Sequence, residues 1–193
     1  MARESGYAVV PAPAPLPSER RVGFAVVALG RLNLEEILPA FSESKKANLV
    51  APVSGSPEKL KVVASQYGIT EIACYSYHNF DSIKDNPEIK AVYIVLPNSM
   101  HREFTERAAR AGKHVLTKKP MATTSEDAKA MIDACKAVDV KLMAAYRIQY
   151  EAYNLRLAEL ARSKTFGRFA CRQPTCRPSQ ISLLPFDPGI WLA

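Results

Sequence analysis

The sequence predicts an α/β domain in which helices cover both faces of a doubly wound, parallel β-sheet. From Arg21 onward, strand-like apolar runs alternate with helical patterns, and the connections between them are short. This alternation is typical of parallel sheets with right-handed crossovers. Two of the runs, residues 22–27 and 92–96, are apolar on successive residues, which indicates strands buried on both faces.

The hydrophobic pattern predicts strands and helices in alternation along the chain. The expected strands lie near residues 22–28, 47–54, 71–75, 91–96, 113–117 and 140–146. The expected helices lie near residues 32–43, 57–67, 80–85, 99–111, 124–138 and 151–163. Hydroxyl side chains precede Glu126 and Asp127, and this order gives the helix near 124–138 an N-cap and an acidic first turn.

The first expected strand leads through a glycine turn into a helix, as in the Rossmann βα unit, whose free backbone N–H groups bind the pyrophosphate of a dinucleotide. The fingerprint Gly-x-Gly-x-x-Gly/Ala is here Ala-Leu-Gly-Arg-Leu-Asn over residues 28–33, so only the middle glycine is kept. Gly30 is the position that lets the backbone approach the pyrophosphate. We therefore predict that Gly30, Arg31 and Leu32 contact the cofactor.

Two residues depart from this fingerprint. Ala28 stands where the tight turn usually requires glycine, and alanine costs about 1 kcal/mol or somewhat more if that residue needs a positive φ. Asn33 stands where helix and strand pack closely, and its polar side chain must find hydrogen-bond partners. An ordinary βα loop that binds no nucleotide is the alternative interpretation of this turn.

The end of the second expected strand bears on cofactor type. NAD-preferring domains carry an acidic residue there, which holds the ribose hydroxyls and would repel a 2′-phosphate. Here Ser54, Gly55 and Ser56 follow the strand, and Lys59 lies in the first turn of the next helix. We predict that Ser54, Ser56 and Lys59 bind the 2′-phosphate of NADP, with NAD as the other possible cofactor. The alternative is that Ser56 only caps the helix and Lys59 is only a surface lysine.

Composition excludes several other classes. The 193 residues, of which 48% are hydrophobic, suffice for one domain plus a tail. The four cysteines and three histidines lack metal-ligand spacing, so we expect no metal site. The net charge of +7 comes from small, separated basic groups, which favours a solvated surface that attracts an anionic cofactor over a nucleic-acid interface. With no apolar stretch typical of a signal or a membrane span, we expect a soluble cytoplasmic protein.

The chain divides into three parts. Residues 1–20 contain a proline-rich stretch and form an expected N-terminal arm, with a disordered leader as the alternative. Residues 21–150 form the expected dinucleotide-binding domain. Residues 151–193 form a helix and the expected start of a second domain.

Motifs spread over residues 21–151 closely resemble the N-terminal domain of the glucose–fructose oxidoreductase and inositol dehydrogenase family. They are Ala-Leu-Gly at 28–30, Ser-Gly-Ser-Pro-Glu-Lys at 54–59, Tyr-His-Asn-Phe-Asp at 77–81, Val-Tyr-Ile-Val-Leu-Pro-Asn-Ser-Met-His at 92–101, Gly-Lys-His-Val at 112–115, Lys-Lys-Pro-Met at 118–121 and Ala-Tyr-Arg at 145–147. The resemblance implies hydride transfer between a nicotinamide cofactor and a sugar or polyol.

The resemblance also assigns residues. The cofactor contacts that it implies near the nicotinamide are Leu96, Pro97, Asn98, His101, Lys119, Pro120 and Arg147. Lys119 is the implied catalytic residue, which touches nicotinamide and substrate and helps to move the hydroxyl proton. Without the resemblance, a buried or surface His101 and an exposed lysine pair at 118–119 are the plainer interpretations.

Two further features separate this sequence from the family pattern. Lys118 replaces the glutamate that ordinarily precedes the lysine, so a second cation stands beside Lys119. Family members also continue into an α/β domain that carries the substrate pocket, supplies further catalytic residues and often forms a homo-oligomer. Residues 186–193 look like the beginning of that region. We therefore expect weak or no activity from this chain, with a non-catalytic NAD(P)-binding module or relic as the alternative.

Overall fold

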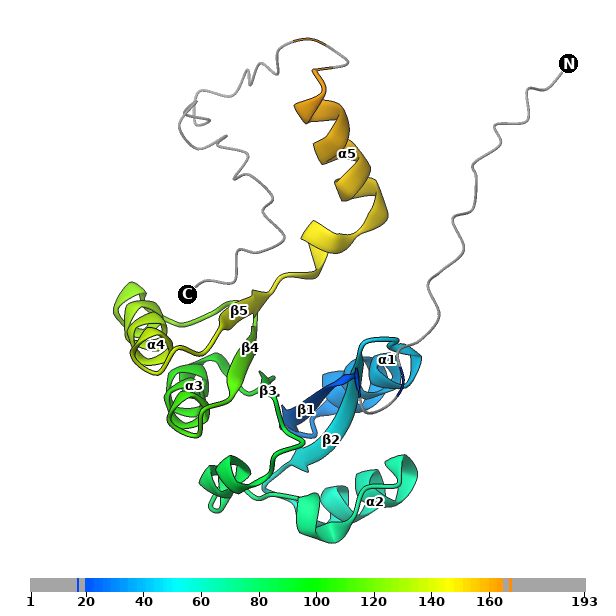
Figure 1. Ribbon diagram of the computed structural model, residues 1–193, viewed down its shortest axis with the longest axis vertical. Helices are drawn as coiled ribbons and strands as arrows, with labels where there is room; N and C mark the ends of the chain where they lie inside the picture. The colour runs from blue at the N-terminus through cyan, green and yellow to red at the C-terminus, as the bar shows by residue number, and fades with distance from the viewer. Residues whose placement is uncertain (1–16, 18–19, 165–166, 168–193) are drawn as a thin grey trace, which may run out of the picture.

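A five-stranded parallel sheet forms the centre of the computed structural model, which describes residue 17, residues 20–164 and residue 167 (Figure 1). Its strand order is β2-β1-β3-β4-β5. The strands are β1 Val22–Val27, β2 Ala47–Val53, β3 Ala91–Ile94, β4 His114–Lys118 and β5 Leu142–Ala145. All four neighbouring pairs are parallel, which confirms the predicted doubly wound α/β class.

The longer helices are α1 Leu38–Glu43, α2 Pro57–Tyr67, α3 His101–Arg110, α4 Ser125–Ala137 and α5 Ala152–Arg162. A π-helical turn, Asn33–Ile37, leads directly into α1. Short 3₁₀ turns lie at Glu71–Ala73, Phe80–Asp85, Asn98–Met100 and Arg147–Tyr150. In Figure 1, α5 extends away from the sheet while α3 and α4 lie side by side.

Each face of the sheet buries its own apolar core, because successive residues of a strand point to opposite faces. Ala25 and Val27 of β1 face the larger core, which also contains Phe104 of α3 and Met131 of α4. Val26 lies between them in sequence and faces the smaller core. That core also contains Leu29, Leu38 of α1 and Val63 of α2. The two cores fix the strand ends, and with them the loops that follow.

Arg107 of α3 ties the turn at Phe80–Asp85 to the larger core. Its guanidinium donates to the Asp81 carboxylate at 3.0 and 3.1 Å and to the Tyr77 carbonyl oxygen at 3.0 Å. It also lies 5.0 Å from the ring centroids of Phe80 and Phe104. Hydrogen bonds from Arg107 hold the pKa of the Asp81 carboxyl below its ordinary value.

The strand predicted near 71–75 is wrong for most of its length. Glu71–Ala73 form a 3₁₀ turn instead, with Ile72 89% exposed. Only Tyr75 joins the sheet, by a parallel bridge to Val53 at the outer side of β2. Tyr75 is the buried apolar residue of this segment. The residues before it pack against no core, so their backbone forms local i→i+3 hydrogen bonds instead of hydrogen bonds to a neighbouring strand.

Other differences concern helix type and element ends. The segment near 80–85 is 3₁₀ rather than α-helical, and the helix expected near 32–43 contains the π turn. The third and fifth strands are shorter than expected. Most of the predicted N-terminal arm and of the region after Lys164 lies outside the described residues. In the part of the chain that is described, no helix combines the length and apolarity needed to cross a membrane.

Candidate functional site

Residues predicted to bind the cofactor follow all five strands of the sheet. Gly30 follows β1, Ser54 follows β2, Leu96 follows β3, Lys119 follows β4 and Arg147 follows β5. Because the strands are parallel, all these positions lie along one edge of the sheet, formed by the carboxyl ends. The strand order reverses between β1 and β3, and open α/β sheets bind ligands at such a switch point.

The turn after β1 has the open backbone that a bound phosphate needs. Ala28 has a φ of +78°, so this position does take the left-handed conformation that disfavours alanine. A Cβ built on Gly30 would meet nothing within 4 Å, and Gly30 is exposed. A helical run of residues 31–43 begins directly after it. The free space and the helix start give an anion access to the backbone N–H groups at Arg31 and Leu32.

Asn33 lies under this turn and is only 1% exposed. Its side-chain amide nitrogen donates to the Ala28 carbonyl oxygen and, at 3.4 Å, to the Val27 carbonyl oxygen. Its Oδ1 is buried and meets no donor among the described residues. The Asn33 amide nitrogen thus has the hydrogen-bond partners that we expected for this side chain, whereas its Oδ1 has none among the described residues.

The junction after β2 joins the turn after β1 through a lysine. Ser54 is 5% exposed, and its hydroxyl accepts from the Ser56 backbone N–H at 3.2 Å. Ser56 caps α2 by accepting from the Lys59 backbone N–H at 3.4 Å. The Lys59 ammonium donates to the Leu29 carbonyl oxygen at 3.1 Å. This cation therefore stands beside the glycine turn instead of pointing freely into solvent.

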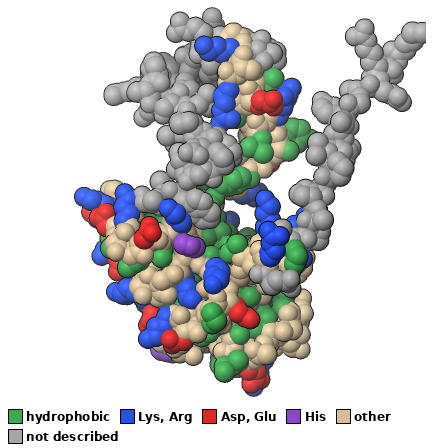
Figure 2. Space-filling view, viewed as in Figure 1, with side chains coloured by type: hydrophobic (Ala, Val, Ile, Leu, Met, Phe, Trp, Pro, Cys, Tyr) green, Lys and Arg blue, Asp and Glu red, His purple; other side chains and the backbone are tan. Residues whose placement is uncertain are grey.

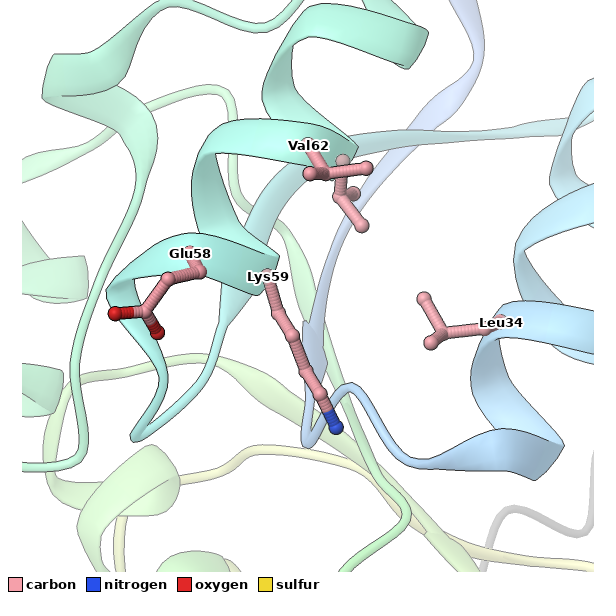
Figure 3. A pocket seen from close by; sticks show the side chains of 5 residues that line it. Leu34, Glu58, Lys59 and Val62 are labelled. Atoms are coloured by element: carbon pink, nitrogen blue, oxygen red, sulfur yellow. The ribbon is translucent and has the colours of Figure 1, made fainter.

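A hollow of about 170 Å³ opens next to Lys59, between the helix that follows β1 and the first turns of α2. Figure 3 shows the Lys59 side chain reaching down from α2 toward the turn, with Leu34 opposite. Apart from Lys59 and Glu58, its lining residues are Leu34, Val62 and Val63. Glu58 accepts from the Ser56 hydroxyl at 2.8 Å, and that bond lowers the pKa of its carboxyl. The hollow therefore joins an apolar wall to two opposite charges, the Lys59 ammonium and the Glu58 carboxylate.

At the same junction, the Tyr77 ring, and not a positive φ, explains why residue 55 is glycine. A Cβ there would lie 3.2 Å from Cε2 of Tyr77, so any larger residue would push the ring aside. Burial raises the pKa of the Tyr77 hydroxyl. The sequence did not predict that the Tyr77 ring packs on Gly55, or that Leu34, Val62 and Val63 line the hollow. The spacing of these residues does not distinguish them from ordinary core residues.

His101 is fully buried, which is one of the plainer interpretations left open above. Its Nε2 lies 2.9 Å from the Leu96 carbonyl oxygen, and its Nδ1 lies 3.0 Å from the Pro120 carbonyl oxygen. The ring thus connects the end of β3 to the loop after β4. Pro97 and Asn98 lie on the surface beside it, while Leu96 is buried.

The lysine pair lies at the end of β4. Lys118 is half-buried, and Lys119 and Pro120 are exposed, joined by a cis peptide bond. Arg147 is exposed on the 3₁₀ turn after β5. Within the described part of the chain, none of these three cations forms an ion pair with a carboxylate. Three uncompensated positive charges therefore follow β4 and β5.

Elsewhere, charges are dispersed. On the face in Figure 2, Lys and Arg side chains occur in small groups, and Asp and Glu side chains lie among them. Within the described ranges, no group of three or more His, Cys, Asp or Glu side chains could hold a metal ion. Cys74 and Cys135 are free thiols, and burial raises the pKa of Cys135 to about 11.

The residues present fit a dinucleotide. The space at Gly30 admits a phosphate, and the Lys59 ammonium stands beside this turn, with the Glu58 carboxylate bound to the Ser56 hydroxyl at the same junction. Fold and edge geometry together define the chain as a Rossmann α/β domain.

Comparison with known proteins places this domain in a family. Residues 22–146 match the model of the oxidoreductase family with the NAD-binding Rossmann fold, and the chain belongs to this Gfo/Idh/MocA family. It is 30% identical over 174 residues to the D-xylose 1-dehydrogenase [NADP(+)] of Haloarcula marismortui, covering 90% of this chain and 48% of that protein.

Two solved structures extend the comparison. The aldose-aldose oxidoreductase from Caulobacter crescentus, complexed with glycerol, is 50% identical with a TM-score of 0.74, covering 75% of this chain and 43% of that one. The WlbA dehydrogenase from Bordetella pertussis, in complex with NADH and UDP-GlcNAcA, is 26% identical with a TM-score of 0.66, covering 77% and 44%. The chain therefore spans less than half the length of these relatives.

Proposed function

We propose that this chain provides the NADP-binding domain of an oxidoreductase that transfers hydride between the cofactor and a CH–OH group of a sugar or polyol. The observation that carries the proposal is the position of Lys59. Its ammonium is held 3.1 Å from a carbonyl oxygen of the glycine turn, at the end of a strand that lacks the acidic residue of NAD-preferring domains. A relative named for its use of NADP supports the same cofactor, and another solved with NADH leaves the choice to experiment.

The proposed site follows the carboxyl edge from β2 to β5. The 2′-phosphate lies against Ser54, Ser56 and Lys59, and the apolar wall at Leu34 and Val62 takes the adenine. The pyrophosphate lies over the turn, against the backbone of Gly30, Arg31 and Leu32. The nicotinamide end then lies against Leu96, Pro97, Asn98, Lys119, Pro120 and Arg147. His101, predicted as a cofactor-binding residue, acts in this set indirectly, because its fully buried ring lies against backbone carbonyl oxygens on both sides and supports the wall.

When bound, the nicotinamide supplies the hydride chemistry. We assign to Lys119 the movement of the substrate hydroxyl proton, since its exposed side chain follows β4 on the edge that binds the cofactor. Lys118 and Arg147 add positive charge nearby, which favours the anionic cofactor and any developing alkoxide. Lys119 is the one residue of this chain proposed to be catalytic.

The same proposal extends to the organisation of the chain. Residues 21–150 act as the dinucleotide-binding domain, residues 151–193 begin a substrate domain, and residues 1–20 form an arm. We place the protein in the cytoplasm, with a sugar or polyol as its small-molecule partner and neither nucleic acid nor membrane. Association into a homo-oligomer would depend on the second domain.

Calorimetric titration of the purified chain with NADPH and with NADH tests the cofactor assignment. We expect micromolar binding of NADPH and weaker binding of NADH. Incubation with NADP and a panel of aldoses and polyols, followed by nicotinamide absorbance, then tests the reaction. Absence of binding to either cofactor would contradict the proposal.

A non-catalytic NAD(P)-binding module is the second candidate. The observation that favours it is Lys118, which puts a cation where the family pattern has a glutamate next to the proton-handling lysine. Binding of NADPH without any sugar-dependent change of absorbance supports the module. Sugar-dependent reduction of NADP, abolished by Lys119→Ala, supports the enzyme.

A further inference from the structure

The turn after β1 combines two unusual residues, Ala28 and Asn33, that contact each other. Ala28 adopts a φ of +78°, which a residue with a Cβ disfavours. Left to itself, this residue would relax toward negative φ. Rotation about its N–Cα bond would then redirect the Ala28 carbonyl and the peptide groups after it, up to Gly30. The phosphate-facing backbone therefore depends on something that resists this rotation.

The side chain of Asn33 spans that rotatable bond. Its amide nitrogen donates to the carbonyl oxygen of Val27, which precedes the N–Cα bond of Ala28, and to the carbonyl oxygen of Ala28, which follows it. The opposite orientation of the amide would set its oxygen against two carbonyl oxygens, so the assignment of Nδ2 follows from the partners. One side chain thus fixes both sides of the strained torsion.

The arrangement has a cost in stability. Asn33 is 1% exposed, and its Oδ1 meets no donor among the described groups. A buried acceptor without a donor destabilises the fold. Asn33 therefore gives up stability at its oxygen while its nitrogen secures the turn.

We propose that Asn33 is a positioning residue for the pyrophosphate of the cofactor and that it compensates for Ala28, by clamping the turn in the conformation that glycine would adopt without help. This inference rests on the proposed function in naming the pyrophosphate as the ligand. The two departures from the glycine fingerprint are then a coupled pair. Each alone weakens the turn, and together they restore its shape.

A double-mutant cycle tests the coupling. We expect Asn33→Ala to raise the Kd for NADPH roughly tenfold, which is the effect of one ordinary hydrogen bond. We expect Ala28→Gly/Asn33→Ala to bind within about threefold of wild type, because glycine needs no clamp. Equal loss in both backgrounds, or no loss in either, overturns the inference.

Asn48→Ala is the matched control. Its Oδ1 is also buried without a donor among the described residues, but Asn48 pairs with Gly23 near the amino ends of β2 and β1, away from the turn. We expect Asn48→Ala to change the melting temperature without changing the Kd for NADPH. If Asn33→Ala does not fold, rescue of folding and binding by Ala28→Gly supports the pair, and failure of the double variant to fold overturns it.

Hydrogen exchange of the free protein separates this inference from the proposed function. The backbone amides of residues 28–34 should exchange faster in Asn33→Ala and at the wild-type rate in the double variant. Wild-type protein that binds neither cofactor would contradict the proposed function and the pyrophosphate role, while the exchange pattern would still decide whether Asn33 clamps Ala28. Unchanged exchange in Asn33→Ala would overturn the clamp itself.

Discussion

Replacing Lys59 by alanine should discriminate between the two nicotinamide cofactors. The ammonium of Lys59 is held beside the glycine turn by its 3.1 Å bond to the Leu29 carbonyl oxygen. The proposed 2′-phosphate lies at the N-terminal turn of α2, the turn that carries Lys59. NADH carries no phosphate there, so the effect should be selective.

The size of the effect follows from the charge and its exposure. Two unit charges about 4 Å apart attract by about 1 kcal/mol in water and by about 4 kcal/mol at an effective dielectric constant of about 20. Lys59 is exposed, so the lower half of that range applies. An attraction of about 1–2.5 kcal/mol predicts a Kd for NADPH raised roughly five- to seventyfold, with the Kd for NADH within about threefold of wild type.

Calorimetric titration of wild type, Lys59→Ala and Lys61→Ala measures the difference. Lys61 is an exposed lysine on the same helix, outside the set that lines the hollow, so its removal matches the change in net charge. The discrimination should shrink as salt rises, because exposed charges are screened. Equal losses for NADPH and NADH in Lys59→Ala would refute the phosphate role and leave Lys59 as a brace for Leu29 alone.

Three other predictions rest on the contacts and burial of single residues. Gly30→Ala should change the free energy of unfolding by no more than about 0.5 kcal/mol, but it should raise the Kd for NADPH more than about tenfold. Gly23→Ala should destabilise the fold, because its Cβ would clash with the Glu88 backbone oxygen. Urea unfolding measures the stability of both variants, and calorimetric titration measures their binding of NADPH. Arg107→Ala should lower the free energy of unfolding by about 2–3 kcal/mol, with Arg110→Ala as the exposed control in urea unfolding. Burial raises the pKa of Cys135 to about 11 from 9.0, so between these pH values the folded state keeps a proton that the unfolded thiol loses. The free energy of unfolding should therefore fall as pH rises from 9.0 to about 11. This loss should be smaller in Cys135→Ala.

The fold was predictable because its signals are local and repeated. The unbroken apolar runs at residues 22–27 and 92–96 predicted strands buried on both faces, and the structure has parallel strands at Val22–Val27 and Ala91–Ile94. The helix predicted near 57–67 is confirmed as α2, which begins at Pro57 and has Ser56 as its N-cap. The segment near 71–75 failed because its apolar residues gave a strand pattern, while only Tyr75 finds a place beside β2.

The candidate site was predictable in its position and less so in its contacts. Parallel strands bring their carboxyl ends to one edge, so the residues after each strand share that edge whatever their side chains do. The bond from Lys59 to the Leu29 carbonyl and those of His101 to carbonyls on two loops involve backbone acceptors, which carry no residue-specific signal. The π turn that begins at Asn33 has no sequence signature either.

Gly23 and Gly30 lie at the two ends of the same strand-and-turn unit and have opposite reasons to be glycine. At Gly23 the Glu88 backbone occupies the space of a Cβ, so glycine allows tight packing at the amino end of β1. At Gly30 the corresponding space is open, so packing within the described residues gives no reason to exclude a side chain. The proposed approach of a pyrophosphate to the backbone would supply that reason. The contrast makes the turn after β1, with Ala28 clamped beside it, the part of the molecule whose shape is better explained by binding than by folding.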